Sequence, residues 1–155
     1  MPVELRSTQR RIRVDLRRVK QAAEKLLKGL KREQMVLSVL LTGDREMAQL
    51  HERWMADPSP TDVLSFPQDP QRRRPPEAAS GASLRRTPPI LGDIAISVET
   101  AARRAPRDPM KEIEKYLIHG ALHLVGHDHA RPREKMAMRA EARRLRRLIT
   151  PRRVS

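Results

Sequence analysis

Four of the five histidines in this 155-residue chain lie between positions 119 and 129. His119 and His123 are four residues apart, so on a helix they lie on the same face, one above the other. Gly126 can end such a helix in a left-handed turn, and His129 follows far enough along for the chain to turn back toward the first two rings. Three imidazoles in this pattern predict a metal site with an open position, which catalysis by a metal ion requires.

The same intervals occur in the H-E-x-x-H-x-x-G-x-x-H zinc peptidases. Those enzymes carry a glutamate general base directly after the first histidine, whereas this chain has Gly120. The pattern therefore predicts metal-dependent chemistry and disfavours an ordinary metallopeptidase. A histidine-rich surface helix or an incidental metal-binding tract fits less well, because apolar residues typical of a buried helix surround the histidines. These residues are Leu117, Ile118, Leu122, Leu124 and Val125.

The other polar residues near the cluster have less direct roles. His127 is predicted not to bind the metal, because neighbouring positions in a turn point apart and only Asp128 separates it from His129. No residue stands out as a general base, and we expect Asp128 to orient a ligand. His51 is the histidine outside the cluster and is expected to form hydrogen bonds rather than bind metal.

The charge of the chain indicates a polyanionic partner. The formal net charge is +14, from 33 basic and 19 acidic residues. Such an excess favours nucleic acid first and an anionic membrane second, although a biased composition could account for the preference for Arg over Lys. Segment 131–155 contains ten basic and two acidic residues, so it contributes +8. The candidate RNA-binding residues are Arg143, Arg144, Arg146 and Arg147.

Length and composition predict a single cytoplasmic domain over residues 1–155. There is no Cys, which excludes disulfides and thiolate ligands. The longest apolar run, Met35 to Leu41, is too short to span a bilayer, and the N-terminus does not have the pattern of a secretory signal. Segment 68–89 is rich in Pro and Arg, has a net charge of +3 and is predicted to be a mobile basic loop.

Hydrophobic periodicity predicts an α+β domain in which helices back a small sheet and the histidines lie on a central buried helix. Strands are predicted at 3–5, 35–41, 62–66 and 91–97, and helices at 15–30, 44–54, 97–105, 109–125 and 131–150. Asp15, Asp44 and Ser97 are the predicted N-caps of the first three helices. The first helix should bury one face, formed by Leu16, Val19, Ala23, Leu26 and Leu30.

Three ordered blocks of this sequence resemble the YbeY endoribonucleases, the bacterial ribosomal RNA maturation factors. Residues 119–129, HGALHLVGHDH, resemble the family signature H-G-x-L-H-L-x-G-Y-D-H. Residues 60–67, PTDVLSFP, resemble the family's second block, and residues 91–97, LGDIAIS, resemble its third. Length and layout are similar over nearly the whole chain.

The resemblance implies an α+β fold with a four-stranded mixed sheet and one Zn²⁺ ion held by three histidines, which map onto His119, His123 and His129. It implies a zinc-dependent, single-strand-specific endoribonuclease that acts on ribosomal RNA, at the three-prime end of the 16S-type small-subunit RNA. The expected partners are ribosomal RNA and ribosomal particles, and neither DNA nor a membrane is expected. Two alternatives remain for the group that attacks the phosphorus atom, namely a water molecule and the ribose 2′-hydroxyl. The alternative is a non-catalytic, zinc-stabilised RNA-binding assembly factor in which His127 is the fourth ligand.

The chain departs from the family pattern at several positions. His127 occupies the position of the signature's usual Tyr. Many members have an Asn and a Tyr-Arg pair before the second block, and the aligned residues here are His51, Trp54 and Met55. Another cation must therefore take the role that the resemblance gives to the family's Arg.

Overall fold

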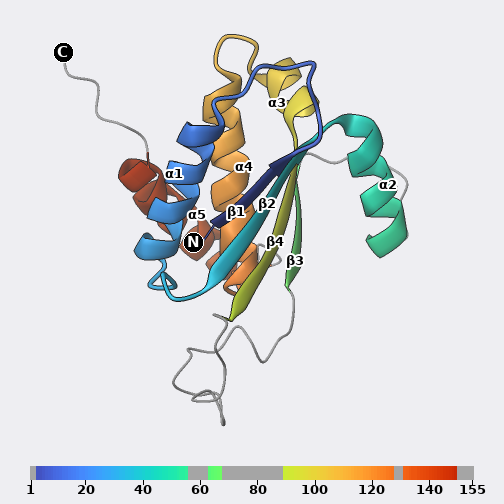
Figure 1. Cartoon of the computed structure of the whole chain (residues 1–155). Helices are drawn as coiled ribbons and strands as arrows, with labels where there is room; N and C mark the ends of the chain where they lie inside the picture. The colour runs from blue at the N-terminus through green and yellow to red at the C-terminus, as the bar shows by residue number, and fades with distance from the viewer. Residues whose placement is uncertain (1–2, 56–62, 68–88, 128–130, 150–155) are drawn as a thin grey trace, which may run out of the picture.

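The computed structural model of the chain describes residues 3–55, 63–67, 89–127 and 131–149 (Figure 1). These residues form strands and helices in a mixed order, with consecutive helices in the C-terminal third, and this α+β arrangement confirms the predicted fold class. The elements are β1 (Val3–Ser7), α1 (Leu16–Gly29), β2 (Val36–Thr42), α2 (Asp44–Met55), β3 (Val63–Pro67), β4 (Ile90–Ser97), α3 (Val98–Arg104), α4 (Pro109–Leu124) and α5 (Pro132–Ile149).

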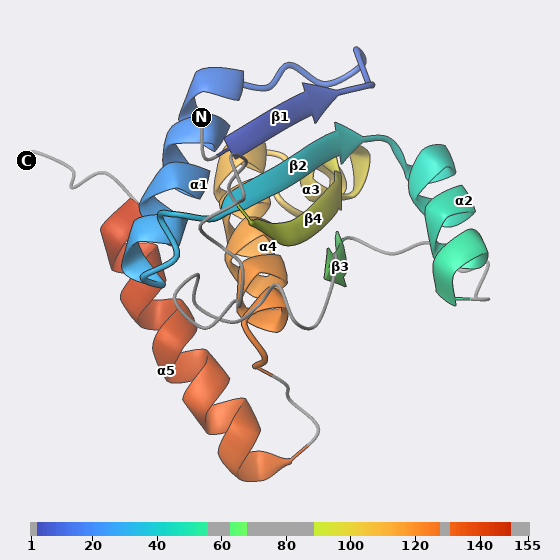
Figure 2. The ribbon, with the colours of Figure 1, turned by 60° about the horizontal axis from the view of Figure 1, so that its bottom comes forward.

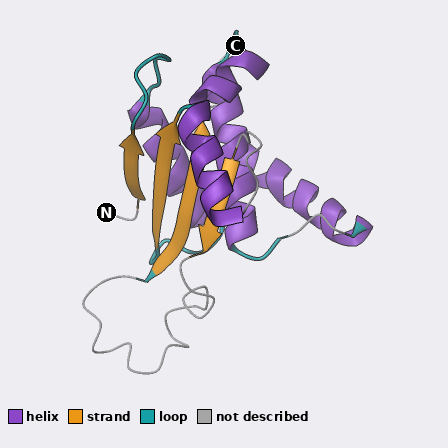
Figure 3. Cartoon of the chain, turned by 90° about the vertical axis from the view of Figure 1, so that its right-hand side faces the viewer, coloured by secondary structure: helices purple, strands orange, loops and turns teal. Residues whose placement is uncertain are grey.

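The strands form one four-stranded sheet in the order β1-β2-β4-β3, shown side by side in Figure 3. β1, β2 and β4 are parallel to one another, whereas β3 at the edge is antiparallel to β4. The sheet is therefore mixed, as the family resemblance implies. Val63 pairs with Ile96 and Phe66 with Asp93, so the second and third family blocks lie beside each other.

The two faces of the sheet bury different side chains, because successive residues of a strand point to opposite sides. Val39 and Ile94 belong to the large core that the sheet shares with α1, α4 and α5. Leu40 and Ala95 face the other way and pack with Met47 of α2 in a smaller cluster. In Figures 1 and 2, α2 accordingly lies apart from α1, α4 and α5.

Helix α4 is the central buried helix that was predicted to carry the histidines. It packs against β3 and β4 and against α1, α3 and α5. The Asp108 carboxylate accepts a hydrogen bond from the Lys111 backbone N–H, and Pro109 occupies the first turn, where no backbone donor is needed. These two residues explain why the helix begins where it does.

The predicted inner face of α1 is partly wrong. Asp15 caps the helix as expected by accepting a hydrogen bond from the Arg18 backbone N–H. However, Leu16 is 44% exposed, and the buried face also includes Ala22 and Leu27. The helix packs between β1, α4 and α5, so its buried face is wider than the single stripe that spacing alone indicated.

A buried ion pair joins α1 to α4. The Arg18 guanidinium donates hydrogen bonds from Nε and Nη2 to the two carboxylate oxygens of Glu114, at 3.2 and 2.9 Å. Glu114 is only 4% exposed. The bidentate geometry matches the fork of donors on Arg to the two acceptors of the carboxylate, which compensates for burying the charge.

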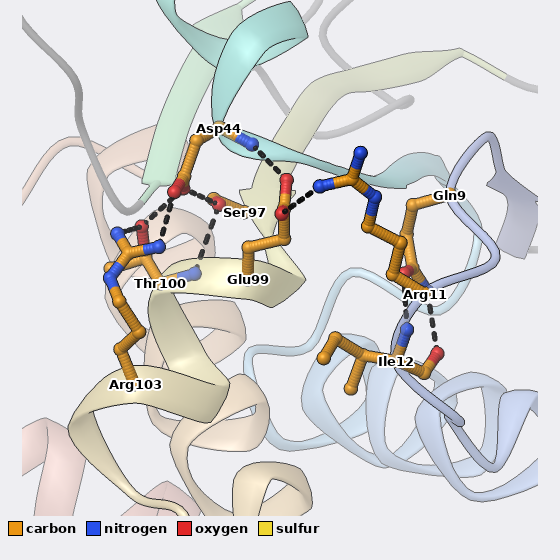
Figure 4. A network of polar contacts seen from close by, with 8 residues as sticks. All are labelled: Gln9, Arg11, Ile12, Asp44, Ser97, Glu99, Thr100 and Arg103. Atoms are coloured by element: carbon orange, nitrogen blue, oxygen red, sulfur yellow. Dashed lines mark hydrogen bonds and ion pairs between the residues drawn. The ribbon is translucent and has the colours of Figure 1, made fainter.

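A second polar group, the Asp44 cluster of Asp44, Ser97, Glu99, Thr100 and Arg103, joins α2 to α3 (Figure 4). The prediction that Asp44 caps its own helix is wrong, because its carboxylate accepts hydrogen bonds from the Ser97 and Thr100 hydroxyls and from Arg103. The Glu99 carboxylate instead accepts the Asp44 backbone N–H at 2.9 Å. Ser97 is the N-cap of α3, as predicted.

The Asp44 cluster also changes the acidity of its central carboxyl group. Partial burial alone would raise the pKa of Asp44, but the hydrogen bonds from Arg103, Ser97 and Thr100 outweigh it and lower the pKa from 3.8 to about 2. The ionised form of Asp44 is therefore the one that holds α2 against α3.

Two further predictions concern the basic loop at 68–89 and membrane-spanning helices. The predicted basic loop at 68–89 lies outside the described residues except for Pro89, whose carbonyl accepts a hydrogen bond from the Val36 N–H at 2.8 Å. Among the described residues, no helix has the length and apolar character needed to cross a membrane.

Candidate functional site

His119 and His123 lie on successive turns of α4, and their side chains meet. Their Nε2 atoms are 3.0 Å apart, the ring centroids are 4.5 Å apart and the ring planes are inclined by 74°. Both side chains are half-buried. The predicted placement of the two rings on one helix face is confirmed.

The geometry of this pair fits two ligands of one metal ion. Two nitrogen ligands at about 2.0–2.1 Å from a tetrahedral Zn²⁺ are separated by about 3.3 Å. In this structure the two Nε2 atoms lie within hydrogen-bond distance, at 3.0 Å, which is also close to this value. Neutral imidazole is also a preferred donor for Zn²⁺.

A glycine turn ends the helix directly after this pair. The Gly126 N–H donates to the His123 carbonyl at 3.1 Å, and the His127 N–H donates to the Leu122 carbonyl at 2.9 Å. Gly126 has φ of 101°, a conformation that glycine adopts without strain. These two bonds form a Schellman motif, so the predicted role of Gly126 in turning the chain is confirmed.

The remaining candidates in the cluster are only partly located. Asp128 and His129 lie outside the described residues, so the third predicted ligand has no described position. Consistent with this gap, the described residues contain no group of three His, Cys, Asp or Glu side chains that could hold a metal ion. His127 is half-buried, and its exclusion from the ligand set stays a prediction.

Gly120, where the peptidases have their general base, lies against the sheet. A Cβ atom at this position would be 2.9 Å from Ile94 Cγ2 and 3.0 Å from Ser65 Oγ. The Ser65 hydroxyl also donates a hydrogen bond to the Gly120 carbonyl at 3.1 Å. The glycine therefore allows α4 to approach β3 and β4 closely, and there is no space at this position for a glutamate.

An open pocket of about 470 Å³ adjoins the histidine pair between α4 and α5, and we call it the α4–α5 pocket. His119 lies in its wall. Six apolar or aromatic residues line it, namely Val63, Tyr116, Ile118, Leu122, Met138 and Ala142. Six cationic residues also line it, namely Arg104, Lys115, Lys135, Arg139, Arg143 and Arg146.

The four arginines predicted to bind RNA fall into two groups. Arg143 and Arg146 line the α4–α5 pocket. Arg144 instead pairs with Glu141 of the same helix, and it donates a hydrogen bond to the carbonyl of Gly29, at the end of α1, at 2.9 Å. This pairing raises the pKa of Arg144 and lowers that of Glu141. Arg147 is exposed on α5 and is not among the pocket-lining residues.

Sequence reasoning missed four of the cations that line the pocket. Lys135 and Arg139 precede Arg143 and Arg146 on α5, and the successive spacings of four, four and three residues place the four side chains on one helix face. Lys115 lies one turn before His119 on α4. These spacings were readable in the sequence, whereas Arg104 reaches the pocket from α3 and had no such signal.

The chain is similar in sequence to one known family over most of its length. The profile of the family described as endoribonuclease YbeY matches residues 4–149. A curated relative named endoribonuclease YbeY from Anaeromyxobacter sp. is 41% identical over 148 residues, which cover 94% of this chain and 67% of the relative. The relative of the same name from Thermobifida fusca is 48% identical over 105 residues, which cover 66% of this chain and 64% of the relative. The chain thus spans about two thirds of the length of these two relatives.

A solved structure has the same fold. The solution structure of TM1509 from Thermotoga maritima superposes with a TM-score of 0.61 over 95% of this chain and 88% of that chain, at 20% sequence identity. The profile match covers all the described helices and strands except the first residue of β1. From this match and from the curated relatives, the chain belongs to the endoribonuclease YbeY family.

Proposed function

We propose that this protein is a zinc-dependent endoribonuclease that cleaves single-stranded RNA in the maturation of ribosomal RNA. The observation that carries the proposal is the histidine pair, with Nε2 atoms 3.0 Å apart, of which His119 lies in the wall of a pocket lined by six cationic residues. Metal ligands beside a cationic pocket suit cleavage of a polyanion, and the curated relatives are named endoribonucleases.

In this proposal, His119, His123 and His129 hold one Zn²⁺ ion. The fixed backbone turn at Gly126 directs the chain after α4, and the third histidine follows three residues later. A bound ion would supply Lewis acidity for attack on a phosphodiester. The contribution of the protein is to orient the two imidazoles through α4 and to attract the RNA through the pocket cations.

The proposed substrate is ribosomal RNA in precursor ribosomal particles, at the three-prime end of the small-subunit RNA. The net charge of +14 favours a large polyanion. Gly120 disfavours a peptide substrate, because it occupies the position of the peptidase general base and leaves no space for a glutamate. A ribosomal RNA substrate implies a cytoplasmic enzyme.

The proposal is tested by measuring metal content and RNA cleavage on the same samples. The wild-type protein should contain about one equivalent of zinc, cut a labelled single-stranded RNA, lose both properties on chelation and regain both when Zn²⁺ is returned. His119→Ala should lower zinc content and slow cleavage by about 100-fold or more, because loss of even an outer partner of a metal ligand costs roughly 10–100-fold. His51→Ala, which removes a histidine of α2, is the matched control and should retain both properties.

Two outcomes would contradict the proposal in different ways. Cleavage by His119→Ala at the wild-type rate would mean that a contaminant cuts the RNA. Full zinc occupancy without cleavage of any single-stranded RNA would favour the non-catalytic assembly factor, in which zinc is structural and His127 is a ligand.

A further inference from the structure

The α4–α5 pocket has the size and shape of a site for one small organic group. Its volume is about 470 Å³. Ligand sites in proteins are typically about 300–1,000 Å³, are mostly apolar and contain a few placed polar groups. Helix α5 packs against α4 (Figures 1 and 2). Residues of both helices, including His119 of α4, line the pocket.

The interior of the pocket is apolar. Ile118 and Leu122 reach it from α4, and Met138 and Ala142 reach it from α5. Tyr116 adds an aromatic ring whose hydroxyl accepts a hydrogen bond from Arg104 at 3.2 Å. Tyr116, Ile118, Leu122 and Met138 are each at most 6% exposed, so a flat aromatic group such as a nucleobase would cover the small apolar surface that remains accessible.

The charged side chains around this interior are of one sign. No Asp or Glu lies among the described residues that line the pocket. Lys135, Arg139, Arg143 and Arg146 follow one face of α5, so they present a row of cations along the pocket. On the α4 side, the Lys115 side chain is 62% exposed and pairs with Glu112 at 3.7 Å, and ion pairs of largely exposed side chains are weak.

An apolar interior between rows of cations is complementary to one nucleotide of a single strand. The base would contact the apolar side chains, and the phosphates on either side of it would contact the cations. A base within a duplex is stacked and paired, so it cannot enter such a pocket without leaving the helix.

On the basis of the proposed function, we infer that the α4–α5 pocket binds one unpaired nucleotide of the RNA substrate beside the bond that is cut. His119 places the proposed metal ion at the edge of this pocket. The pocket then determines the preference for single strands, because only an unpaired base can enter it. The C-terminal arginines act through Arg143 and Arg146, which line the pocket, and not through Arg144, which is engaged with Glu141 and Gly29.

The inference is tested by fluorescence anisotropy with a labelled single-stranded hexanucleotide RNA and the full-length protein in chelator, which allows binding without cleavage. Affinity is measured over a range of salt concentrations. Arg143→Gln/Arg146→Gln removes two pocket cations, whereas Arg133→Gln/Arg147→Gln removes the same charge from exposed positions of α5 that do not line the pocket. The pocket variant should reduce the slope of log affinity against log salt by about 1.4, which is about 0.7 for each phosphate that the protein no longer neutralises. The control should reduce it by less than half as much.

A second pair of variants fills the pocket without changing its charge. Ala142→Phe places a large side chain in the pocket, whereas Ala137→Phe makes the same change at an exposed position of α5 that does not line it. Ala142→Phe should weaken binding about tenfold with an unchanged salt slope, because it displaces a base, whose stacking contributes to affinity, rather than a phosphate. Ala137→Phe should bind as the wild type does. Thermal unfolding is measured for each variant, and Ala142→Leu replaces Ala142→Phe if the latter does not fold.

The possible outcomes separate this inference from the proposed function. Equal affinity for Ala142→Phe and wild type, or equal salt slopes for the two double arginine variants, would overturn the nucleotide pocket, whatever the protein cleaves. The predicted binding pattern in a protein that never cleaves RNA would support the pocket and reject the proposed nuclease.

Discussion

Two groups of charged side chains in the described part of the chain differ in what opposes them. In the Asp44 cluster and in the Arg18–Glu114 pair, each acid accepts hydrogen bonds from donors on another helix. In the α4–α5 pocket, six cationic residues gather with no acidic residue among the described lining. The first group joins secondary-structure elements within the chain.

This difference indicates which charges act on the structure and which act on a ligand. Opposite charges that are held by two or more hydrogen bonds stabilise the fold. If one partner is removed, the other charge stays buried without a partner, which costs free energy. Like charges that lie together repel one another and contribute little to folding, so an external anion is the partner that suits them. Three changes test this distinction, in order of decreasing effect on stability.

The largest loss of stability is expected for Arg18→Met. It leaves the Glu114 carboxylate, which is 4% exposed, without its bidentate donor. Breaking a buried pair costs roughly 3–5 kcal/mol, and because Arg18 itself is 36% exposed we expect about 2 kcal/mol. Chemical denaturation measures the loss. Arg17→Met, on an exposed neighbouring position, should change stability by less than about 0.5 kcal/mol.

The double variant Arg18→Met/Glu114→Leu sharpens this test. Replacing both partners of a buried ion pair by apolar residues is often neutral or stabilising. The double variant should therefore be more stable than Arg18→Met alone. A double variant that is less stable than the single one would mean that Glu114 has a role other than pairing with Arg18.

A smaller, pH-dependent loss is expected for Asp44→Asn. The pKa of Asp44 is about 2 in the folded protein and has an ordinary value of 3.8, so the unfolded state binds the proton more tightly. The stabilising contribution is therefore complete above about pH 4 and is lost as the pH falls through 2. Asp44→Asn should lose about 1 kcal/mol at neutral pH and should show a flatter decline in stability between pH 4 and 2 than the wild type. The free energy of unfolding, measured over this range, decides the matter, with the exposed Glu24→Gln as control.

The smallest loss is expected in the pocket. Arg143→Gln/Arg146→Gln should change the free energy of unfolding by no more than about 0.5 kcal/mol, because both side chains are exposed and surface changes of this kind have small effects. A loss as large as that of Arg18→Met would mean that these arginines hold α5 in place. The distinction between the two groups of charges would then fail.

The sequence predicted the helix that carries the site, for identifiable reasons. Helix periodicity placed His119 and His123 on one face, and Gly126 was recognised as a terminating residue because few other residues adopt its backbone conformation. Such features depend on interactions within about one turn of the chain. Strand positions were also predicted, mainly from short apolar runs bounded by turn or breaker residues, such as the run at 35–41 and the stop at Pro67.

Contacts between distant segments were beyond sequence reasoning. Arg18 and Glu114 are 96 residues apart, and nothing local to either residue indicates the other. The same holds for the arginines of α5. Positions 143, 144, 146 and 147 project from the helix in different directions, and the sequence does not tell which of them faces a pocket. Only the packing of α5 on α1 and α4 reveals that Arg146 lines the pocket and that Arg144 bonds to the Gly29 carbonyl.

The close packing at Gly120 has a consequence for how this family could change. In the genetic code, one base separates some glycine codons from glutamate codons, so the H-E-x-x-H motif of the zinc peptidases is a single mutational step away. That step places a side chain where even a Cβ atom would lie 2.9 Å from Ile94 and 3.0 Å from Ser65. The peptidase base could therefore arise here only together with a change at Ile94 or Ser65 that makes space for the new side chain. A single base change is thus not sufficient, because the packing of α4 on the sheet requires a second change.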